Sequence, residues 1–208
     1  MKKKLMLIGG GGHCRSVIDS VLSLGIYDEI GIVDAHENPV LGISVIGSDD
    51  DIPKLIEAGW TSAFVTVGSV GDTSLRRKLY KMITEFNLEV PVIIDPSALI
   101  AKNVEIKKGV FVGKRVVINS ESVLGLCSII NTGAIIEHDC FVGDFAHISS
   151  GATVCGNVVI GNDSHLGAGS TVKQNINIGS NSLIGAGSIV LKDVPNSVKA
   201  YGNPCKVV

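Results

Sequence analysis

The sequence lacks the features that mark three large classes of protein. No window of eighteen apolar residues occurs, which excludes a membrane-spanning helix, and the apolar run Leu5 to Ile8 is too short for a signal-peptide core. Lysine and arginine number 18 against 20 acidic residues, so the formal charge of −2 offers no basic field to nucleic acid or anionic lipid. The five cysteines are an odd number with no Cys-x-x-Cys pair, which favours a reduced, cytoplasmic protein.

The sequence does contain a repeat of six residues that occupies half of its length. From Ile94 to Val190 every sixth residue is isoleucine, leucine or valine, seventeen times without a slip. A period of six belongs neither to a helix nor to a hairpin, and it predicts a parallel β-helix in which three hexads close a coil of about eighteen residues. The branched residue of each hexad is expected to point inward, and glycine or asparagine to supply positive φ at the corners.

The residues before the repeat predict a separate α/β domain. Strands are expected at 4–8, 29–33, 63–67 and 90–94, and helices at 13–24, 49–58 and 73–86. Alternating strands and helices predict a Rossmann-like domain with a parallel sheet. The expected division is therefore a domain over 1–93, a β-helix over 94–194, and a carboxyl-terminal cap over 195–208 that covers the open edge of the last coil.

The glycine loop after the first strand is not a dinucleotide-binding fingerprint. The pattern Gly-x-Gly-x-x-Gly would need glycine at Cys14 or Arg15, depending on where it starts. A nicotinamide cofactor is therefore disfavoured, and a purely structural tight turn stays open. Backbone amides at the helix start can still hold an anion, and Asp34 lies at a strand end where such sheets bind ribose or base.

The order of these parts resembles the NeuD-type sugar O- and N-acetyltransferases of the hexapeptide-repeat acyltransferase superfamily. The resemblance rests on a loop similar to Gly-Gly-His-Gly, a short Rossmann-like domain and an uninterrupted run of hexads, and it covers nearly the whole chain. It implies a left-handed β-helix, a homotrimer, and acetyl-CoA bound as co-substrate between neighbouring prisms. It also implies that the first domain holds a nucleotide-sugar. The residues that would surround its uridine and diphosphate are Gly11, Gly12, His13, Asp34 and Gly68.

His138 and Asp139 are the candidate catalytic residues. They are the third and fourth residues of the hexad that begins at Ile136, and side chains at these corner positions are expected to point outward. Acetyl transfer needs a base near neutrality, which imidazole supplies, and an adjacent carboxylate can orient it. In the resembled family the same segment reads His-Glu or His-Asp and carries the base. The alternative is a surface histidine that stacks on the next coil.

Four residues are candidates for binding acetyl-CoA. Gly156 lies eighteen residues after His138, and its exposed amide is a candidate oxyanion donor. A glycine required by the corner is an alternative that is compatible with this role. By resemblance, His147 touches acetyl-CoA, while Ala168 and Ala186 line the path of the pantetheine.

His147 and His165 are eighteen residues apart and are expected to stack at about 4.8 Å. Such a pair raises a metal site of the kind found in β-helical carbonic anhydrases. Catalytic zinc needs three converging protein ligands and an open position, whereas His138 lies half a coil from His147. No metal is therefore expected.

The leading hypothesis is an acetyl-CoA-dependent N-acetyltransferase acting on an amino group of a nucleotide-linked amino-deoxysugar, with UDP as the expected carrier, in bacterial surface-glycan biosynthesis. An O-acetyltransferase of sialic acid or a related sugar is the first alternative, because a hydroxyl acceptor asks for the same base. A nucleotide-sensing module without catalytic activity is the alternative from a different class. Neither nucleic acid nor insertion into a membrane is expected.

Overall fold

The computed structural model describes residues 2–208, which form two compact units. The first comprises the described residues up to Gly68 together with Ser74–Ile93, and the second comprises Ser69–Thr73 and Ile94–Val208. None of the helices within residues 2–208 has the length and apolar character needed to cross a bilayer.

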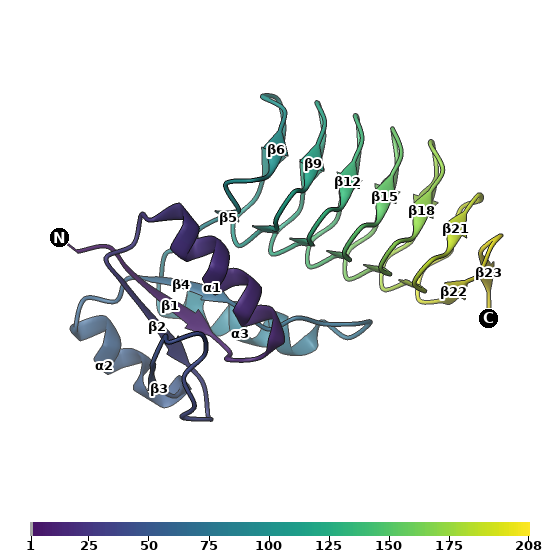
Figure 1. Cartoon of the computed structure of the whole chain (residues 1–208). Coiled ribbons are helices and arrows are strands. Elements are labelled where there is room, and N and C mark those ends of the chain that lie inside the picture. Colours follow the sequence, from purple (N-terminus) through teal and green to yellow (C-terminus); the bar gives the residue numbers. More distant parts are fainter. Residues whose placement is uncertain (1) are drawn as a thin grey trace. The chain divides into compact units, whose positions relative to one another are not determined.

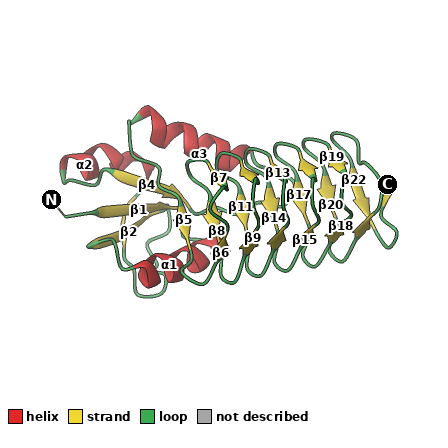
Figure 2. Cartoon of the chain, turned by 90° about the horizontal axis from the view of Figure 1, so that it is seen from above, coloured by secondary structure: helices red, strands yellow, loops and turns green. Residues whose placement is uncertain are grey.

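The first unit is a four-stranded parallel sheet with the strand order β3-β2-β1-β4. Its strands are β1 (Lys4–Ile8), β2 (Glu29–Val33), β3 (Val45–Gly47) and β4 (Ser62–Val65). Its helices are α1 (Gly12–Leu24), the short 3₁₀ helix η1 (Asp49–Asp51), α2 (Ile52–Glu57) and α3 (Ser74–Glu85). Figure 2 shows α1 on one face of the sheet and α2 and α3 on the other. The predicted Rossmann-like α/β unit is therefore confirmed.

Alternation along β1 explains how both faces of this sheet are covered. Successive side chains of a strand point to opposite faces. Met6 and Ile8 share one core cluster with Ile52 of α2 and Ile83 of α3. Leu5 and Leu7 point to the other face and are also fully buried. Because β1 is apolar at every one of these positions, it lies at the centre of the sheet.

Two details of the first unit differ from the sequence prediction. Strand β3 was missed, because it has only three residues and ends in a glycine. The strand expected at 90–94 shrinks to β5 (Ile93–Ile94), which joins a sheet of the β-helix rather than the sheet of the first unit. The apolar run there serves the transition into the repeat, a role that periodicity alone does not distinguish from a sheet strand.

The second unit is a parallel β-helix whose strands recur every six residues along three sheets (Figure 1). Its strands after β5 are β6 (Leu99–Ile100), β7 (Glu105–Ile106), β8 (Phe111–Val112), β9 (Val117–Ile118), β10 (Val123–Leu124), β11 (Ile129–Ile130), β12 (Ile135–Ile136), β13 (Phe141–Val142), β14 (His147–Ile148), β15 (Thr153–Val154), β16 (Val159–Ile160), β17 (His165–Leu166), β18 (Thr171–Val172), β19 (Asn177–Ile178), β20 (Leu183–Ile184), β21 (Ile189–Val190), β22 (Lys199–Tyr201) and β23 (Lys206–Val207). Strand β22 pairs in parallel with β20, and β23 pairs antiparallel with β22.

Each coil repeats the previous one eighteen residues later, as the pairing of Ile136 with Val154 illustrates. The second residue of each strand is the branched residue of its hexad, and from Val112 to Val190 all of these are buried. The residues with positive φ lie three places after the branched one, as at Asp139 and Asn157. The predicted inward direction of the branched residues is thus confirmed.

The glycines that directly follow the branched residues serve a purpose that the sequence analysis did not foresee. They have no positive φ. A Cβ at Gly125, Gly143 or Gly161 would lie 2.5, 2.6 or 2.4 Å from backbone atoms of the next coil. At these positions glycine permits close approach between coils, whereas the left-handed corners are held by other residues.

Candidate active site

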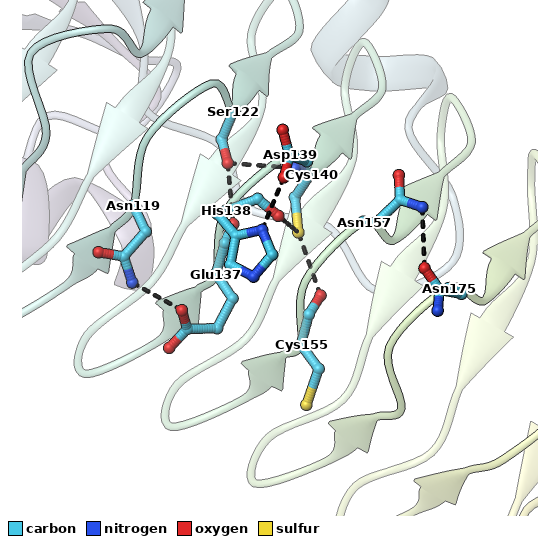
Figure 3. A network of polar contacts seen from close by, with 9 residues as sticks. All are labelled: Asn119, Ser122, Glu137, His138, Asp139, Cys140, Cys155, Asn157 and Asn175. Carbon is cyan, nitrogen blue, oxygen red and sulfur yellow. Dashed lines mark hydrogen bonds and ion pairs between the residues drawn. The ribbon is translucent and has the colours of Figure 1, made fainter.

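His138 and Asp139 form a pair on one corner of the β-helix, directly after β12 (Figure 3). His138 Nδ1 lies 2.6 Å from Asp139 Oδ2, and the two side chains are 60% and 55% exposed. The predicted outward direction of both side chains is confirmed. If the imidazole is neutral, a proton on Nδ1 donates to the carboxylate and leaves the lone pair on Nε2, where it can accept a proton from an incoming nucleophile.

Asp139 differs from the other residues in its column along the corner. Asn103 donates to Glu121 one coil on (2.8 Å), and Asn157 donates to Asn175 (2.8 Å). Asp139 lies between these pairs and shares the left-handed backbone of Glu121, Asn157 and Asn175, with φ of 59°, but its carboxylate turns to the neighbouring histidine. The side-chain hydrogen bonds between successive coils are therefore interrupted at the coil that carries His138.

Hydrogen bonds from both neighbouring coils hold the backbone around His138 (Figure 3). Ser122 Oγ donates to the carbonyl of Glu137 (2.9 Å) and accepts from the amide of Cys140 (3.2 Å). The Cys140 thiol donates to the carbonyl of Cys155 (3.2 Å). Burial raises the pKa of Cys140, so the thiol stays protonated and keeps its donor role.

Gly156 lies on the next coil against the ring of His138. A Cβ at this position would lie 2.7 Å from both Cε1 and Nε2 of the imidazole. Its φ is outside the left-handed region, which is occupied instead by Asn157. A left-handed backbone is therefore not the reason for glycine here, and the steric reason that remains is the ring of His138.

His147 on β14 and His165 on β17 stack as predicted. Their ring centroids are 4.9 Å apart and their planes are nearly perpendicular, at 89°. His147 Nδ1 donates to the carbonyl of Ser69 (2.9 Å), and His165 Nε2 lies 3.2 Å from Ser149 Oγ. Burial lowers the pKa of His165 and favours its neutral form. Within residues 2–208 no group of three or more histidine, cysteine, aspartate or glutamate side chains is arranged to hold a metal.

The other residues predicted to bind acetyl-CoA lie on the same β-helix. Ala168 and Ala186 are exposed and aligned on successive coils, where the amide of Gly187 donates to the carbonyl of Ala168 (2.8 Å). With its Nδ1 engaged by Ser69, His147 presents only Nε2 to another group, and that atom is 3.5 Å from Asn131 Nδ2. This proximity of Asn131 to His147 was not foreseen from the sequence.

In the first unit, Asp34 connects the glycine loop to the end of β2. Its Oδ2 accepts from the amide of Gly10 (2.6 Å) and its Oδ1 from the amide of His36 (2.8 Å). Burial opposes ionisation, but these backbone hydrogen bonds outweigh it and hold the pKa of the carboxyl below its usual range. The carboxylate of Asp34 is therefore ionised near neutral pH and holds the loop through these hydrogen bonds.

The predicted nucleotide-binding residues gather around this loop. Gly11 and Gly12 are exposed at the start of α1, and the Cβ of His13 is 3.4 Å from where a Cβ of Gly68 would lie. A pocket of about 330 Å³ includes Asp34 together with Arg15 and His36. The last two were missed by the sequence analysis. Arg15 could have been found as the first charged residue of a helix that follows a glycine loop.

Comparisons with known proteins agree with both units. The PglD N-terminal domain family matches residues 4–83, and the bacterial transferase hexapeptide family (six repeats) matches residues 133–174. PerB from Caulobacter crescentus, solved in complex with CoA and GDP-perosamine, is 38% identical, with a TM-score of 0.93 over 99% of this chain and 97% of that chain.

A second solved relative covers the whole chain. The acetyltransferase domain of PglB from Neisseria gonorrhoeae, in complex with acetyl coenzyme A, is 32% identical, with a TM-score of 0.92 over 100% of both chains. WeeI from Acinetobacter baumannii, at 21% identity and a TM-score of 0.88 over 99% of this chain and 100% of that chain, agrees in fold. The chain therefore belongs to the family that its sequence predicted, the NeuD-type sugar acetyltransferases of the left-handed β-helix superfamily, and it is an acyltransferase.

Proposed function

We propose that the protein transfers the acetyl group of acetyl-CoA to an amino group of a nucleotide-linked amino-deoxysugar, with His138 as the general base. The observation that carries this proposal is the exposed His138–Asp139 pair, joined at 2.6 Å through Nδ1, which leaves the lone pair of a neutral imidazole on Nε2. Support comes from PerB, solved with CoA and GDP-perosamine, and from the PglB acetyltransferase domain, solved with acetyl-CoA. The product would serve bacterial surface-glycan biosynthesis.

His138 would accept a proton and then return it during the transfer of the acetyl group. The amine nitrogen attacks the thioester carbonyl, and Nε2 of His138 takes the proton that the nitrogen loses. The tetrahedral intermediate then collapses, so that the carbon–sulfur bond breaks, the amide remains, and the imidazolium returns the proton to the departing CoA sulfur. A general base contributes about 10²- to 10⁴-fold to such a step.

Asp139 has an orienting and electrostatic part in this reaction. Its carboxylate keeps the proton on Nδ1, and it favours the imidazolium that forms when Nε2 takes the second proton. The amide of Gly156 is a candidate donor to the oxyanion of the intermediate.

The residues proposed to bind the two substrates belong to different units. Gly11 is the N-cap of α1, and Gly12 and His13 begin the helix, where backbone amides suit a diphosphate. Asp34 and Gly68 would contact the nucleoside. UDP is the carrier expected from the family resemblance, and GDP is the second candidate because PerB was solved with GDP-perosamine. His147, Ala168 and Ala186 would contact acetyl-CoA.

A homotrimer in the cytoplasm completes the proposal. On one face of the β-helix the outward residues Phe141 and Val159 are 38% and 39% exposed, and burial of such apolar side chains favours association with a second copy. The five cysteines are all free thiols, which suits a reducing compartment. Mass measurement by light scattering would test the trimer.

The test is CoA release from acetyl-CoA, measured with wild type and His138→Ala. The acceptors are UDP-4-amino-sugars, GDP-perosamine and free sialic acids. Turnover with one amino-sugar nucleotide that is lost in the variant would support the proposal and name the carrier. Turnover confined to sialic acids would replace N-acetylation by O-acetylation. Absence of turnover with every acceptor would favour a nucleotide-sensing module.

A further inference from the structure

The other coils of the β-helix show which residues can occupy the position of Gly156. The equivalent residues of the other coils, spaced by eighteen, are Lys102, Ser120, His138, Gln174 and Lys192. Every one of them has a side chain, so the coil tolerates one at this position. A specific neighbour must therefore account for the glycine at 156.

Neither of the two general reasons for glycine in this β-helix applies at Gly156. Its φ is not left-handed, in contrast to that of Asn157, which is 55°. It also does not approach the backbone of the next coil, as Gly143 and Gly161 do. The three atoms nearest to a Cβ at 156 all belong to the His138 ring: Cε1 and Nε2 at 2.7 Å and Cδ2 at 3.3 Å.

We propose that Gly156 is a positioning residue whose missing side chain leaves a seat for the His138 imidazole. This inference rests on the proposed role of His138 as the base. The carboxylate of Asp139 holds the ring at Nδ1, and the ring lies where a side chain at position 156 would begin, with Cε1 and Nε2 nearest to that point. Because ordinary carbon contacts begin near 3.4 Å, a methyl group at 156 displaces the ring and moves Nε2, the atom that takes the proton.

An exposed imidazole can rotate away at little cost in folding free energy. A side chain at position 156 is therefore expected to lower activity without lowering stability. We expect Gly156→Ala to lower kcat by about 10²-fold, with unchanged KM for both substrates and an unchanged melting temperature. Gln174→Ala, at the same position of the following coil, is the matched control and is expected to retain full activity.

A double-mutant cycle separates the seat from other roles of Gly156. In a His138→Ala background the seat is empty, so adding Gly156→Ala is expected to change kcat by less than about twofold. If the two losses multiply instead, Gly156 acts independently of the imidazole and the proposal is wrong. Alanine keeps the backbone amide, so Gly156→Ala preserves the candidate oxyanion donor. If this variant retains full activity, His138 does not need the space that the glycine leaves, and the proposal is wrong.

A measurement on the resting protein keeps this test independent of the proposed reaction. Nitrogen NMR of the imidazole reports the tautomer and the Nδ1 hydrogen bond to Asp139. We expect the His138 signals to shift in Gly156→Ala and to stay in place in Gln174→Ala. Unchanged His138 signals in Gly156→Ala would contradict the seat, even in a protein that turned over no acceptor at all.

Discussion

The two units build their candidate sites in different ways. On the β-helix, His138 meets its partners in the next residue, Asp139, and one coil later, Gly156. In the α/β unit, Asp34 meets Gly10, which is twenty-four residues away, through a loop of irregular backbone. The first arrangement follows from a fixed period and the second from how loops close over a sheet. Substitutions should therefore separate the two units into chemistry and nucleotide affinity.

The largest effect is expected from His138→Ala. Loss of the base should lower kcat by about 10²- to 10⁴-fold, with little change in KM for acetyl-CoA or the nucleotide-sugar. Steady-state kinetics with both substrates varied would measure it, and Lys102→Ala, two coils earlier in the same column, is the control. An equal loss in binding would show that the two units do not divide chemistry from affinity.

A smaller loss is expected from Asp139→Asn. Asparagine tolerates the left-handed φ of 59° and keeps an oxygen that can accept from Nδ1, but it removes the charge that favours the imidazolium. We expect kcat to fall about 10- to 100-fold, with an unchanged melting temperature. A comparable loss in stability would mean that the carboxylate serves the corner rather than His138.

Asp34→Ala tests whether the α/β unit sets the affinity for the nucleotide-sugar. It frees the glycine loop, so KM for the nucleotide-sugar should rise about tenfold while kcat at saturation is retained. Because the folded carboxyl has a lowered pKa, the unfolded chain binds a proton first as the pH falls, and the stabilisation is lost below about pH 4. Thermal melts of wild type and variant should accordingly differ at pH 7 and converge in acid.

The smallest effect is expected from His165→Leu, which restores the residue type of Leu183 one coil later. Burial lowers the pKa of His165, so below about pH 6.5 the unfolded state takes up a proton that the folded state resists. Wild type should therefore lose stability between pH 7 and pH 5, and the leucine variant should lose less. Melting temperatures across this range would test it, and identical slopes would contradict the burial of a neutral imidazole.

Residues whose position is set by the six-residue period could be predicted from the sequence, whereas residues in irregular loops could not. His138 was predicted to point outward and the branched residues inward, because a period of six assigns every residue a direction. The stacking of His147 on His165 followed from the same register. Strand β3 and the pocket residues Arg15 and His36 were missed, because no period governs the loops that carry them.

The sequence by itself determined the two-part architecture, the register of the coils, the exposure of the His138–Asp139 pair and the family. A repeat conveys these features because each coil copies the hydrogen bonding of the previous one, so that position in the hexad specifies position in space. Only the tertiary structure decided that Asp139 turns to His138 and that the ring lies against Gly156. It also decided that Asp34 fastens the glycine loop. These contacts depend on side-chain rotamers and loop closure, which arise from neighbours distant in the chain.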